Sequence, residues 1–212
     1  MKVELLTPKS FFQFMVDSAV KSAQICYANE GKEVNSKEFL SRIIKHNHGT
    51  ILEHIFLKFR ISGISRALLQ ELARHRLATL SVESTRHTLK KYFANDNALE
   101  ILKSIDTDLL LGDYAKDDYI IATMGQIIGR IAGLLEIYPD IPNDVLKYFL
   151  PEFWPTKLDL SLNIRELRHI IDLRTSPRAL KEFQVLAHEL FNAVPDEFKY
   201  LLKDCVHEEA QS

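Results

Sequence analysis

The stretch on which the interpretation of this chain depends is Glu71-Leu-Ala-Arg-His-Arg-Leu-Ala-Thr-Leu-Ser-Val-Glu-Ser-Thr-Arg86. Apolar residues at helical spacing between positions 65 and 73 predict a short helix before it, with Ser65 as the N-cap. That helix runs into Arg74-His75-Arg76. Arginine is rarely buried without a partner, and its planar guanidinium suits bidentate contact with phosphate or carboxylate. The stretch therefore indicates either an anion-binding site or a solvated helix end whose basic residues complement the helix dipole.

The pattern on either side predicts a mixture of strands and helices. Alternating apolar and polar residues predict strands at 54–62 and 158–163, and an extended return at 84–92. Helical spacing predicts a long helix from 108 to 138 and another from 163 to 173, the second capped by Asn163. The chain shows no internal repeat, low-complexity segment or linker. We expect one domain over residues 1–212.

Composition limits the class of protein. The 212 residues are 46% hydrophobic and 26% charged, as in an ordinary globular protein, and the formal net charge is −2. That balance gives no bulk basic surface for nucleic acid. Cys26 and Cys205 form neither a CxxC pair nor a disulfide framework, and the first residues do not read as a secretory signal. We therefore expect a cytoplasmic protein that binds no nucleic acid.

The segment from Ile120 to Tyr138 is apolar enough to be compared with a membrane helix. Gly125, Gly129 and Gly133 stand four residues apart in it, as in the small-residue faces of membrane helices. Arg130 lies near its middle, however, and a charge there is costly in lipid. We expect no membrane association, and instead a buried helix that packs closely along its glycine face.

Three histidines and a carboxylate within nine residues suggest a second kind of site. The segment is His46-Asn-His-Gly-Thr-Ile-Leu-Glu-His54. Its spacing does not match the H-E-x-x-H zinc pattern, and no cysteine or aspartate cluster joins it. A loop with one or two site-facing histidines is favoured, and we expect no metal. A metal-dependent hydrolase on His46, His48 and His54 and a nucleic-acid-binding module on residues 74–76 remain as alternatives.

Arg74-His75-Arg76, followed by seven residues and Ser84, resembles the RHRx7S signature of flavin-dependent thymidylate synthases, the ThyX family. Further segments resemble that family in the right order: His48–His54, Ile61–Arg66, Asn163–Arg165 and Asp172–Arg174. The resemblance is good over residues 46–90 and 146–190 and weak over 91–140. It implies an α+β fold in which long helices pack around a small antiparallel sheet.

The resemblance also implies the chemistry. Members of the family methylate dUMP to dTMP with 5,10-methylenetetrahydrofolate, and NADPH supplies electrons through FAD. The residues matching FAD contacts are Thr50, Arg74, His75, Arg76, Val82, Asn163, Arg165 and His169, with His48 as a flavin or folate neighbour. Those matching dUMP contacts are Glu71, Arg74, Ser84, Arg86, Lys147 and Arg174. Arg174 would face the uracil edge and stabilise the ring deprotonated at N3. The family implies a homotetramer whose FAD and dUMP sites are shared between subunits.

Several positions depart from the family pattern. His87 stands where tyrosine is usual, and Lys147 where arginine is frequent, so a phosphate contact there would lack a planar fork. His169 stands where asparagine also occurs, and a contact at Val82 would use the backbone. Thymidylate synthases without a flavin attack uracil with a cysteine, for which this chain offers no comparable setting. Because serine needs a nearby base to become a nucleophile, substrate binding is the favoured role for Ser84.

Overall fold

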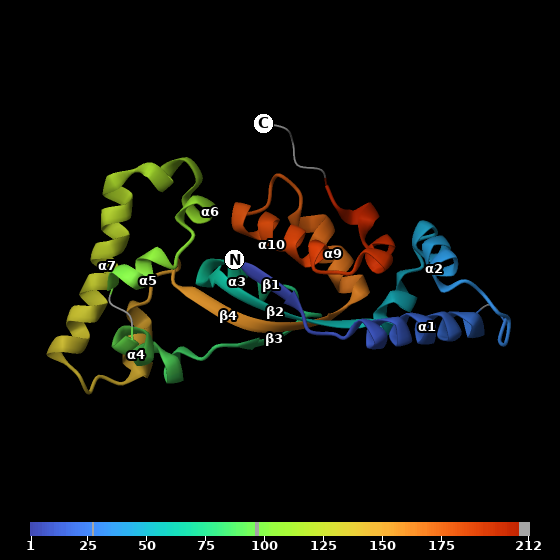
Figure 1. The fold of residues 1–212 in the computed structure, drawn as a ribbon, viewed down its shortest axis with the longest axis horizontal. Coiled ribbons are helices and arrows are strands. Elements are labelled where there is room, and N and C mark those ends of the chain that lie inside the picture. Colours follow the sequence, from blue (N-terminus) through green and yellow to red (C-terminus); the bar gives the residue numbers. More distant parts are fainter. Residues whose placement is uncertain (27, 96–97, 208–212) are drawn as a thin grey trace. The chain divides into compact units, whose positions relative to one another are not determined.

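The computed structural model of the protein describes residues 1–26, 28–95 and 98–207. It is an α+β fold with a four-stranded antiparallel sheet in the order β1-β2-β4-β3 (Figure 1), so the predicted fold class is confirmed. The strands are β1 (Lys2–Leu5), β2 (Phe56–Ser65), β3 (Thr79–Val82) and β4 (Pro155–Asn163). The helices are α1 (Lys9–Cys26), α2 (Ser36–Lys45), α3 (Arg66–Leu72), α4 (Thr85–Asn95), α5 (Ala98–Lys103), α6 (Thr107–Leu111), α7 (Asp118–Ile137), α8 (Asn143–Leu146), α9 (Ile164–Arg174) and α10 (Lys181–Asn192). Short 3-10 turns are η1 (Gly49–His54), η2 (Gly112–Lys116), η3 (Lys147–Phe149), η4 (Asp196–Leu201) and η5 (Lys203–Cys205).

The chain forms two compact units. The helical unit contains Met1, Ser62–Leu72 and Val82–Leu158, and the terminal unit contains Lys2–Ile61, Ala73–Ser81 and the chain from Asp159 onward. The boundaries fall within β2, β3 and β4, so these strands contribute residues to both units. That the chain is one catalytic domain stays a prediction.

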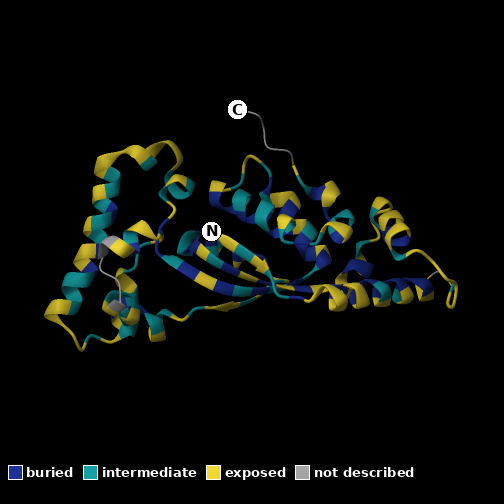
Figure 2. Ribbon diagram, in the orientation of Figure 1, coloured by how far each residue is buried: buried dark blue, intermediate teal, exposed yellow. Residues whose placement is uncertain are grey.

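The terminal unit has its core between strands and helices. In β2, the buried residues Leu57, Phe59 and Ile61 alternate with exposed ones, which is the pattern of a strand with one face inside (Figure 2). Helix α10 contacts both β1 and α9. Phe12 of α1 stacks on Phe198 of η4 at a ring-centroid distance of 4.1 Å. These contacts hold the helices that carry several of the predicted site residues.

The helical unit has a separate core around Trp154, which is 1% exposed. The indole stacks on Phe93 at 5.5 Å and meets Tyr92 edge-on at 5.8 Å, both on α4. The other buried members of the cluster are Leu89, Ile101, Ile105, Met124, Ile128, Ile131 and Leu146. This core fixes α4, which carries Arg86, and α8, which ends just before Lys147; both residues match dUMP contacts.

The predicted extended return at 84–92 is wrong. Residues Thr85–Asn95 form α4, and β3 precedes them at Thr79–Val82. Leu89, Tyr92 and Phe93 are spaced three and four residues apart, which places them together on the helix face that packs against Trp154. Tertiary packing of this face decides the local structure.

The predicted helix from 108 to 138 is interrupted. Helix α6 ends at Gly112, whose φ of +54° lies in the left-handed region that glycine tolerates best. Asp117 then caps α7, because its side chain accepts hydrogen bonds from the backbone N–H groups of Tyr119 and Ile120 at 2.9 and 3.1 Å. Two helices joined by a 3-10 turn therefore replace the single one.

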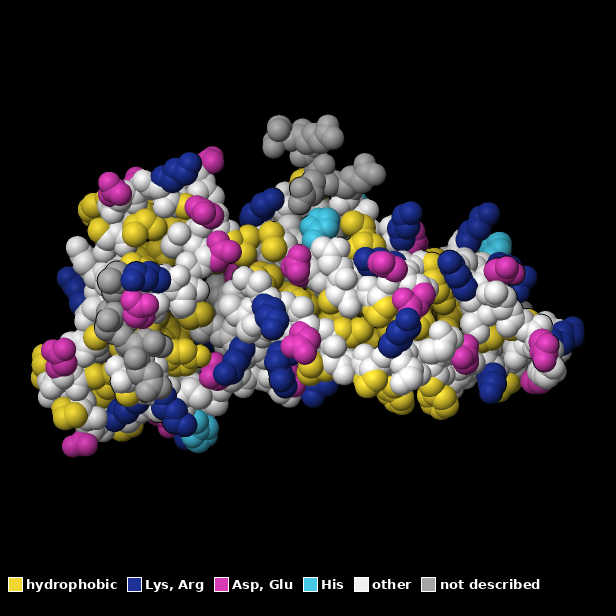
Figure 3. All heavy atoms as spheres, viewed as in Figure 1, with side chains coloured by type: hydrophobic (Ala, Val, Ile, Leu, Met, Phe, Trp, Pro, Cys, Tyr) yellow, Lys and Arg dark blue, Asp and Glu magenta, His cyan; other side chains and the backbone are white. Residues whose placement is uncertain are grey.

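Helix α7 is more exposed than the sequence predicts. It is long and apolar enough to cross a membrane by length and composition, yet only 17% of its most apolar window is buried. A Cβ at Gly125 would lie 3.4 Å from Leu102, but at Gly129 or Gly133 it would meet no described heavy atom within 4 Å. The prediction of close packing along the glycine face is therefore wrong. Figure 3 shows hydrophobic side chains (yellow) at the surface of this unit.

Candidate functional site

The motif Arg74-His75-Arg76 lies in the turn that follows α3. Ser65 caps this helix as predicted, because its hydroxyl oxygen accepts the Leu68 N–H at 3.0 Å. Arg74 and Arg76 are exposed, whereas His75 between them is 6% exposed. The three neighbouring side chains therefore have different surroundings. Because the His75 side chain is buried, a flavin would contact this residue through its backbone atoms.

The imidazole of His75 is the centre of a buried polar network in the terminal unit. Its Nδ1 lies 3.2 Å from Oε1 of Glu166, and its Nε2 accepts a hydrogen bond from Nε of Arg174 at 3.3 Å. The rings of His169 and Phe183 each meet it edge-on at 5.7 Å. Burial lowers the pKa of His75, although the hydrogen bond with Glu166 opposes this effect. The imidazole is therefore neutral near pH 7.

Arg174 is the last residue of α9 and is half-buried. Its guanidinium carbon lies over the ring of Phe183 at 4.3 Å from the centroid, a cation–π contact. Helix α9 begins at the predicted cap, Asn163, whose Oδ1 accepts a hydrogen bond from the Glu166 N–H at 2.8 Å. His75 and Phe183 together fix the plane of the Arg174 guanidinium.

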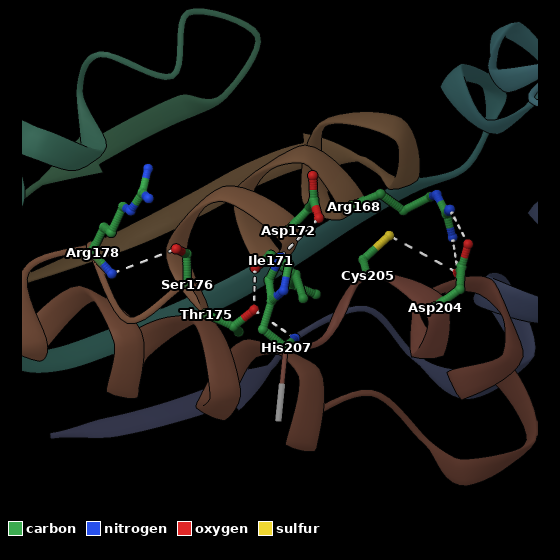
Figure 4. Close-up of polar contacts among 9 residues, drawn as sticks. All are labelled: Arg168, Ile171, Asp172, Thr175, Ser176, Arg178, Asp204, Cys205 and His207. Carbon is green, nitrogen blue, oxygen red and sulfur yellow. Dashed lines mark hydrogen bonds and ion pairs between the residues drawn. The ribbon is translucent and has the colours of Figure 1, made fainter. Parts of the chain in front are cut away.

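The carboxyl end of α9 is anchored on its other side by the C-terminal segment (Figure 4). Arg168 donates to both carboxylate oxygens of Asp204 at 2.7 Å. The Thr175 hydroxyl donates to the Ile171 carbonyl at 2.7 Å and accepts the His207 N–H at 3.0 Å, and the His207 ring lies 3.1 Å from Asp172. The Arg168 and Thr175 contacts fix the backbone from which Arg174 projects, whereas His207 and Asp172 meet through exposed side chains.

The two cysteines differ in their surroundings. Cys205 is buried beside Asp204, and burial raises the pKa of its thiol to about 11. Cys26 is exposed at the end of α1. A thiol with such a raised pKa is a poor nucleophile near pH 7, which supports the expectation that this protein does not use Cys205 in that role.

Thr50 and Arg165 come from elements that touch, because η1 packs on α9. Arg165 forms an ion pair with Glu53 at the end of η1. A Cβ added at Gly49 would lie 3.3 Å from Nε of Arg165, so the absence of a side chain there permits this close approach. His169 is one turn further along α9 than Arg165, as the predicted helix requires.

His46 and His48 line a pocket in the terminal unit. Their ring centroids are 6.4 Å apart, and the pocket has a volume of about 430 Å³. Its other lining residues are Asn29, Phe39, Arg42 and Ile43. Within residues 1–26, 28–95 and 98–207, no three histidine, cysteine or acidic side chains are grouped to hold a metal ion.

The remaining predicted residues belong to the helical unit: Glu71, Val82, Ser84, Arg86 and Lys147. Nε of Arg86 lies 2.7 Å from Oδ1 of Asp144, and Nζ of Lys147 lies 3.8 Å from the same oxygen. The Asn143 amide donates to the Arg86 carbonyl at 2.7 Å. The structure therefore brings Arg86 and Lys147 together on one carboxylate.

Val82 and Ser84 both precede α4, Val82 as the last residue of β3. Ser84 immediately precedes the helix, and its carbonyl accepts hydrogen bonds from the Thr88 N–H at 3.1 Å and the Thr88 hydroxyl at 3.0 Å. The side chain of Ser84 is exposed, and that of Val82 is 38% exposed. Glu71 is half-buried on α3.

Sequence reasoning missed three residues that contact predicted site residues, namely Asp144, Glu166 and Phe183. It singled out Glu53 within the histidine-rich segment but not as the partner of Arg165. One of the three missed residues left a signal, since Asn163 followed three residues later by Glu166 matches a capping box. The capping box identifies the local role of Asn163 but not the contact of Glu166 with His75, which lies 91 residues away. Contacts between distant segments carry no local pattern.

Comparison with known proteins identifies the family. The family model described as "Thymidylate synthase complementing protein" matches residues 13–198. A flavin-dependent thymidylate synthase of Helicobacter pylori is 35% identical over 90% of this chain and 94% of its own length. The chain belongs to the flavin-dependent thymidylate synthase family.

Other flavin-dependent thymidylate synthases agree with this assignment. The protein of that name from Campylobacter jejuni is 36% identical over 82% of this chain and 83% of its own length. The crystal structure of the Helicobacter pylori enzyme with FAD and dUMP superposes with a TM-score of 0.78 at 32% identity, and covers 98% of this chain and 100% of that one. The resemblance to flavin-dependent thymidylate synthases is therefore confirmed.

Proposed function

We propose that this protein methylates dUMP to dTMP, with 5,10-methylenetetrahydrofolate as the carbon donor and NADPH as the reductant through FAD. Tetrahydrofolate is the second product. The observation that carries the proposal is the match to a relative solved with FAD and dUMP, which covers 98% of this chain. Membership of the flavin-dependent thymidylate synthase family supports the same reaction.

The residues assigned to FAD suit an anionic dinucleotide. Arg74, Arg76 and Arg165 expose guanidinium groups in the terminal unit, and guanidinium forks bind phosphate bidentately. The remaining FAD residues in the proposal are Thr50, His75, Val82, Asn163 and His169, with His48 beside the flavin or the folate. Bound FAD carries reducing equivalents from NADPH, and these side chains bind and orient it.

The residues assigned to dUMP include groups for its phosphate and a group for its uracil ring. Arg86 and Lys147 share the single carboxylate of Asp144, so the three side chains together keep one net positive charge for the phosphate. Glu71, Arg74 and Ser84 complete the binding set. The positive charge of Arg174 would favour the uracil ring deprotonated at N3, which raises electron density at C5 where the new bond forms.

Ser84 binds substrate in this proposal and does not act as a nucleophile. Its exposed side chain stands immediately before α4, where its carbonyl already accepts a hydrogen bond from Thr88. A nucleophilic serine needs a base within hydrogen-bond reach. Arg86, two residues beyond it, is a cation and cannot serve as that base.

The proposed active form is a cytoplasmic homotetramer with FAD and dUMP sites at subunit interfaces. Each unit has apolar surface that a partner subunit would cover. On α1, Phe11, Phe14 and Ile25 are 52%, 64% and 66% exposed, and on α7, Tyr119 and Ile137 are 81% and 70% exposed. Exposed apolar surface of this kind favours association.

The proposed function is tested first by the visible absorption spectrum of the purified protein after incubation with FAD and desalting. We expect retained flavin that bleaches when NADPH is added without oxygen, and bleaches faster when dUMP is present. Formation of dTMP is then measured directly. A folded protein that retains no flavin would contradict the proposal and return attention to the nucleic-acid and metal alternatives.

We predict that Arg174→Ala retains the fold and FAD but loses dTMP formation. Removing the guanidinium removes the charge assigned to the anionic pyrimidine, and losses of one such electrostatic contact are about 100- to 1,000-fold in turnover. The measurement is dTMP formed per bound flavin. Turnover equal to that of the unchanged protein would contradict the assigned role.

A further inference from the structure

Glu166 has no role in the function proposed above, although its position is unusual for a glutamate. Its side chain is 7% exposed, and glutamate is almost never fully buried unless it is paired. Its partner is Nδ1 of His75 at 3.2 Å, and that ring is 4% exposed. A buried carboxylate that contacts a buried imidazole beside Arg174 calls for a chemical explanation.

The hydrogen-bond pattern fixes the tautomer of His75. Nε of Arg174 carries a hydrogen and can only donate, so Nε2 of His75 must accept and carries no proton. The single proton of the neutral ring is therefore on Nδ1, where it is donated to Oε1 of Glu166. The opposite tautomer would direct an N–H of His75 at the N–H of Arg174, and this contact would be repulsive.

We propose that Glu166 is a positioning residue for the reaction: through His75, it holds the Arg174 guanidinium in the orientation that meets the pyrimidine. This inference rests on the role of Arg174 given under the proposed function. A carboxylate that fixes the tautomer and orientation of an imidazole, which in turn orients the reacting group, is a known arrangement in catalysis. Here the group so oriented is a guanidinium.

The other contacts of Arg174 show why this hydrogen bond matters. The backbone of α9 is anchored to the C-terminal segment through Arg168 and Thr175, and Phe183 supports one face of the guanidinium. A cation over an aromatic ring can still rotate in the plane of that ring. The hydrogen bond from Nε to His75 opposes this rotation, and its direction depends on the Glu166 carboxylate.

The test compares Glu166→Gln with a matched control on the same helix. The control, Asp172→Asn, makes the same carboxylate-to-amide change. Asp172 also contacts a histidine, but the partner is His207 at 3.1 Å and the Asp172 side chain is exposed. In Glu166→Gln, the amide can donate to Nδ1 and so favour the wrong tautomer of His75. We expect turnover at saturating dUMP to fall about 10- to 100-fold, because small misplacements of a catalytic group have effects of this size. Asp172→Asn should retain turnover.

Two readouts separate positioning from general stability. Both variants should retain FAD and unfold at similar denaturant concentrations, so that only turnover distinguishes them. In a background of Arg174→Lys, which keeps the charge but lacks the Nε donor, adding Glu166→Gln should change turnover less than twofold. Additive losses in that double variant would overturn the proposal, because they would mean that Glu166 does not act through Arg174.

A measurement on the unchanged holoenzyme requires no variant to fold. Nitrogen-15 NMR of histidine-labelled protein should show a neutral His75 with its proton on Nδ1. A proton on Nε2 would overturn the proposal. If the unchanged enzyme forms no dTMP, the proposed function has failed. If it forms dTMP while Glu166→Gln equals Asp172→Asn, only the positioning role has failed.

Discussion

The residues of the motif Arg74-His75-Arg76 show how burial decides the chemistry of neighbours in sequence. The outer two are exposed cations suited to anions, and the middle one is enclosed between Glu166 and Arg174. No pattern around position 75 distinguishes these roles, because the partners come from α9. The sequence therefore identified the motif, while the direction of each side chain depends on tertiary contacts.

We predict that the stability of the protein falls as the pH drops below about 6.5, the usual pKa of histidine in an unfolded chain. Burial lowers the pKa of His75 in the folded state, so the unfolded state binds more protons just below that pH. The contribution to stability is therefore complete above the unfolded pKa and is lost as the pH falls toward the folded pKa. Urea unfolding at about pH 7.5 and about pH 5.5 measures the change.

The control for this experiment is His75→Gln, which cannot titrate in that range. The groups that face His75 in the structure are Glu166, Arg174 and His169, and all three remain in the control. The dependence of unfolding free energy on pH should therefore be shallower in the variant. Equal dependence in the two proteins would mean that other histidines cause it.

At the scale of elements, the sequence predicted those structures whose cause is local. Strand β4 and helix α9 were predicted because alternation and the cap at Asn163 mark them directly. Helix α4 was missed because its apolar face packs against Trp154, which is more than sixty residues away in the sequence. The residues of that face are Leu89, Tyr92 and Phe93. The break at Gly112 was missed because a glycine within an apolar segment does not by itself reveal a positive φ.

Helix α3 shows how much one cap contributes. It has seven residues, and its first N–H groups are bonded to the Trp154 and Glu152 carbonyls and to the Ser65 hydroxyl. We predict that Ser65→Ala lowers the free energy of unfolding by about 0.5–2 kcal/mol, the usual cost of losing a cap. It should also weaken dUMP binding, because Glu71 lies on the same helix. Chemical unfolding and dUMP titration measure the two effects.

Asn35→Ala is the matched control for that prediction. Asn35 caps α2 by accepting the Glu38 N–H at 3.1 Å, and α2 carries no residue assigned to dUMP. We expect a similar or smaller loss of stability with no change in dUMP affinity. Equal losses of dUMP affinity in both variants would contradict a specific role for α3.

At the scale of the whole molecule, residues assigned to the reaction belong to both compact units. Those assigned to dUMP are mainly in the helical unit, and those assigned to FAD are mainly in the terminal unit. In the homotetramer proposed above, each unit is also contacted by residues of another subunit. In that assembly another subunit would cover the apolar surface of α7, whose exposure in the single chain the sequence did not reveal.

We predict that Gly129→Leu together with Gly133→Leu lowers the molecular mass in solution without unfolding the chain. Neither added side chain would begin within 4 Å of a described heavy atom, and leucine favours a helix over glycine by nearly 1 kcal/mol. A subunit packed on α7 would be displaced by the larger side chains. Light scattering after size-exclusion chromatography measures the mass, and circular dichroism measures helix content.

The pair Phe11→Ala and Phe14→Ala tests the surface of α1 in the same way. Their rings are 6.0 Å apart and both are exposed, so their removal costs little in the isolated chain. A smaller assembly in only one of the two double variants identifies the covering surface. An unchanged mass in both would exclude these helices as interfaces, and a monomeric starting protein would contradict the tetramer itself.

The unequal cysteines provide a means of observing such assembly directly. With the Cys205 thiol buried and its pKa raised to about 11, a maleimide reagent near neutral pH should modify Cys26 alone. Each subunit then carries one fluorophore at a defined place without any engineered residue. Mixing subunits labelled with donor and acceptor dyes would follow their exchange in real time, and the same label would report whether FAD or dUMP slows it.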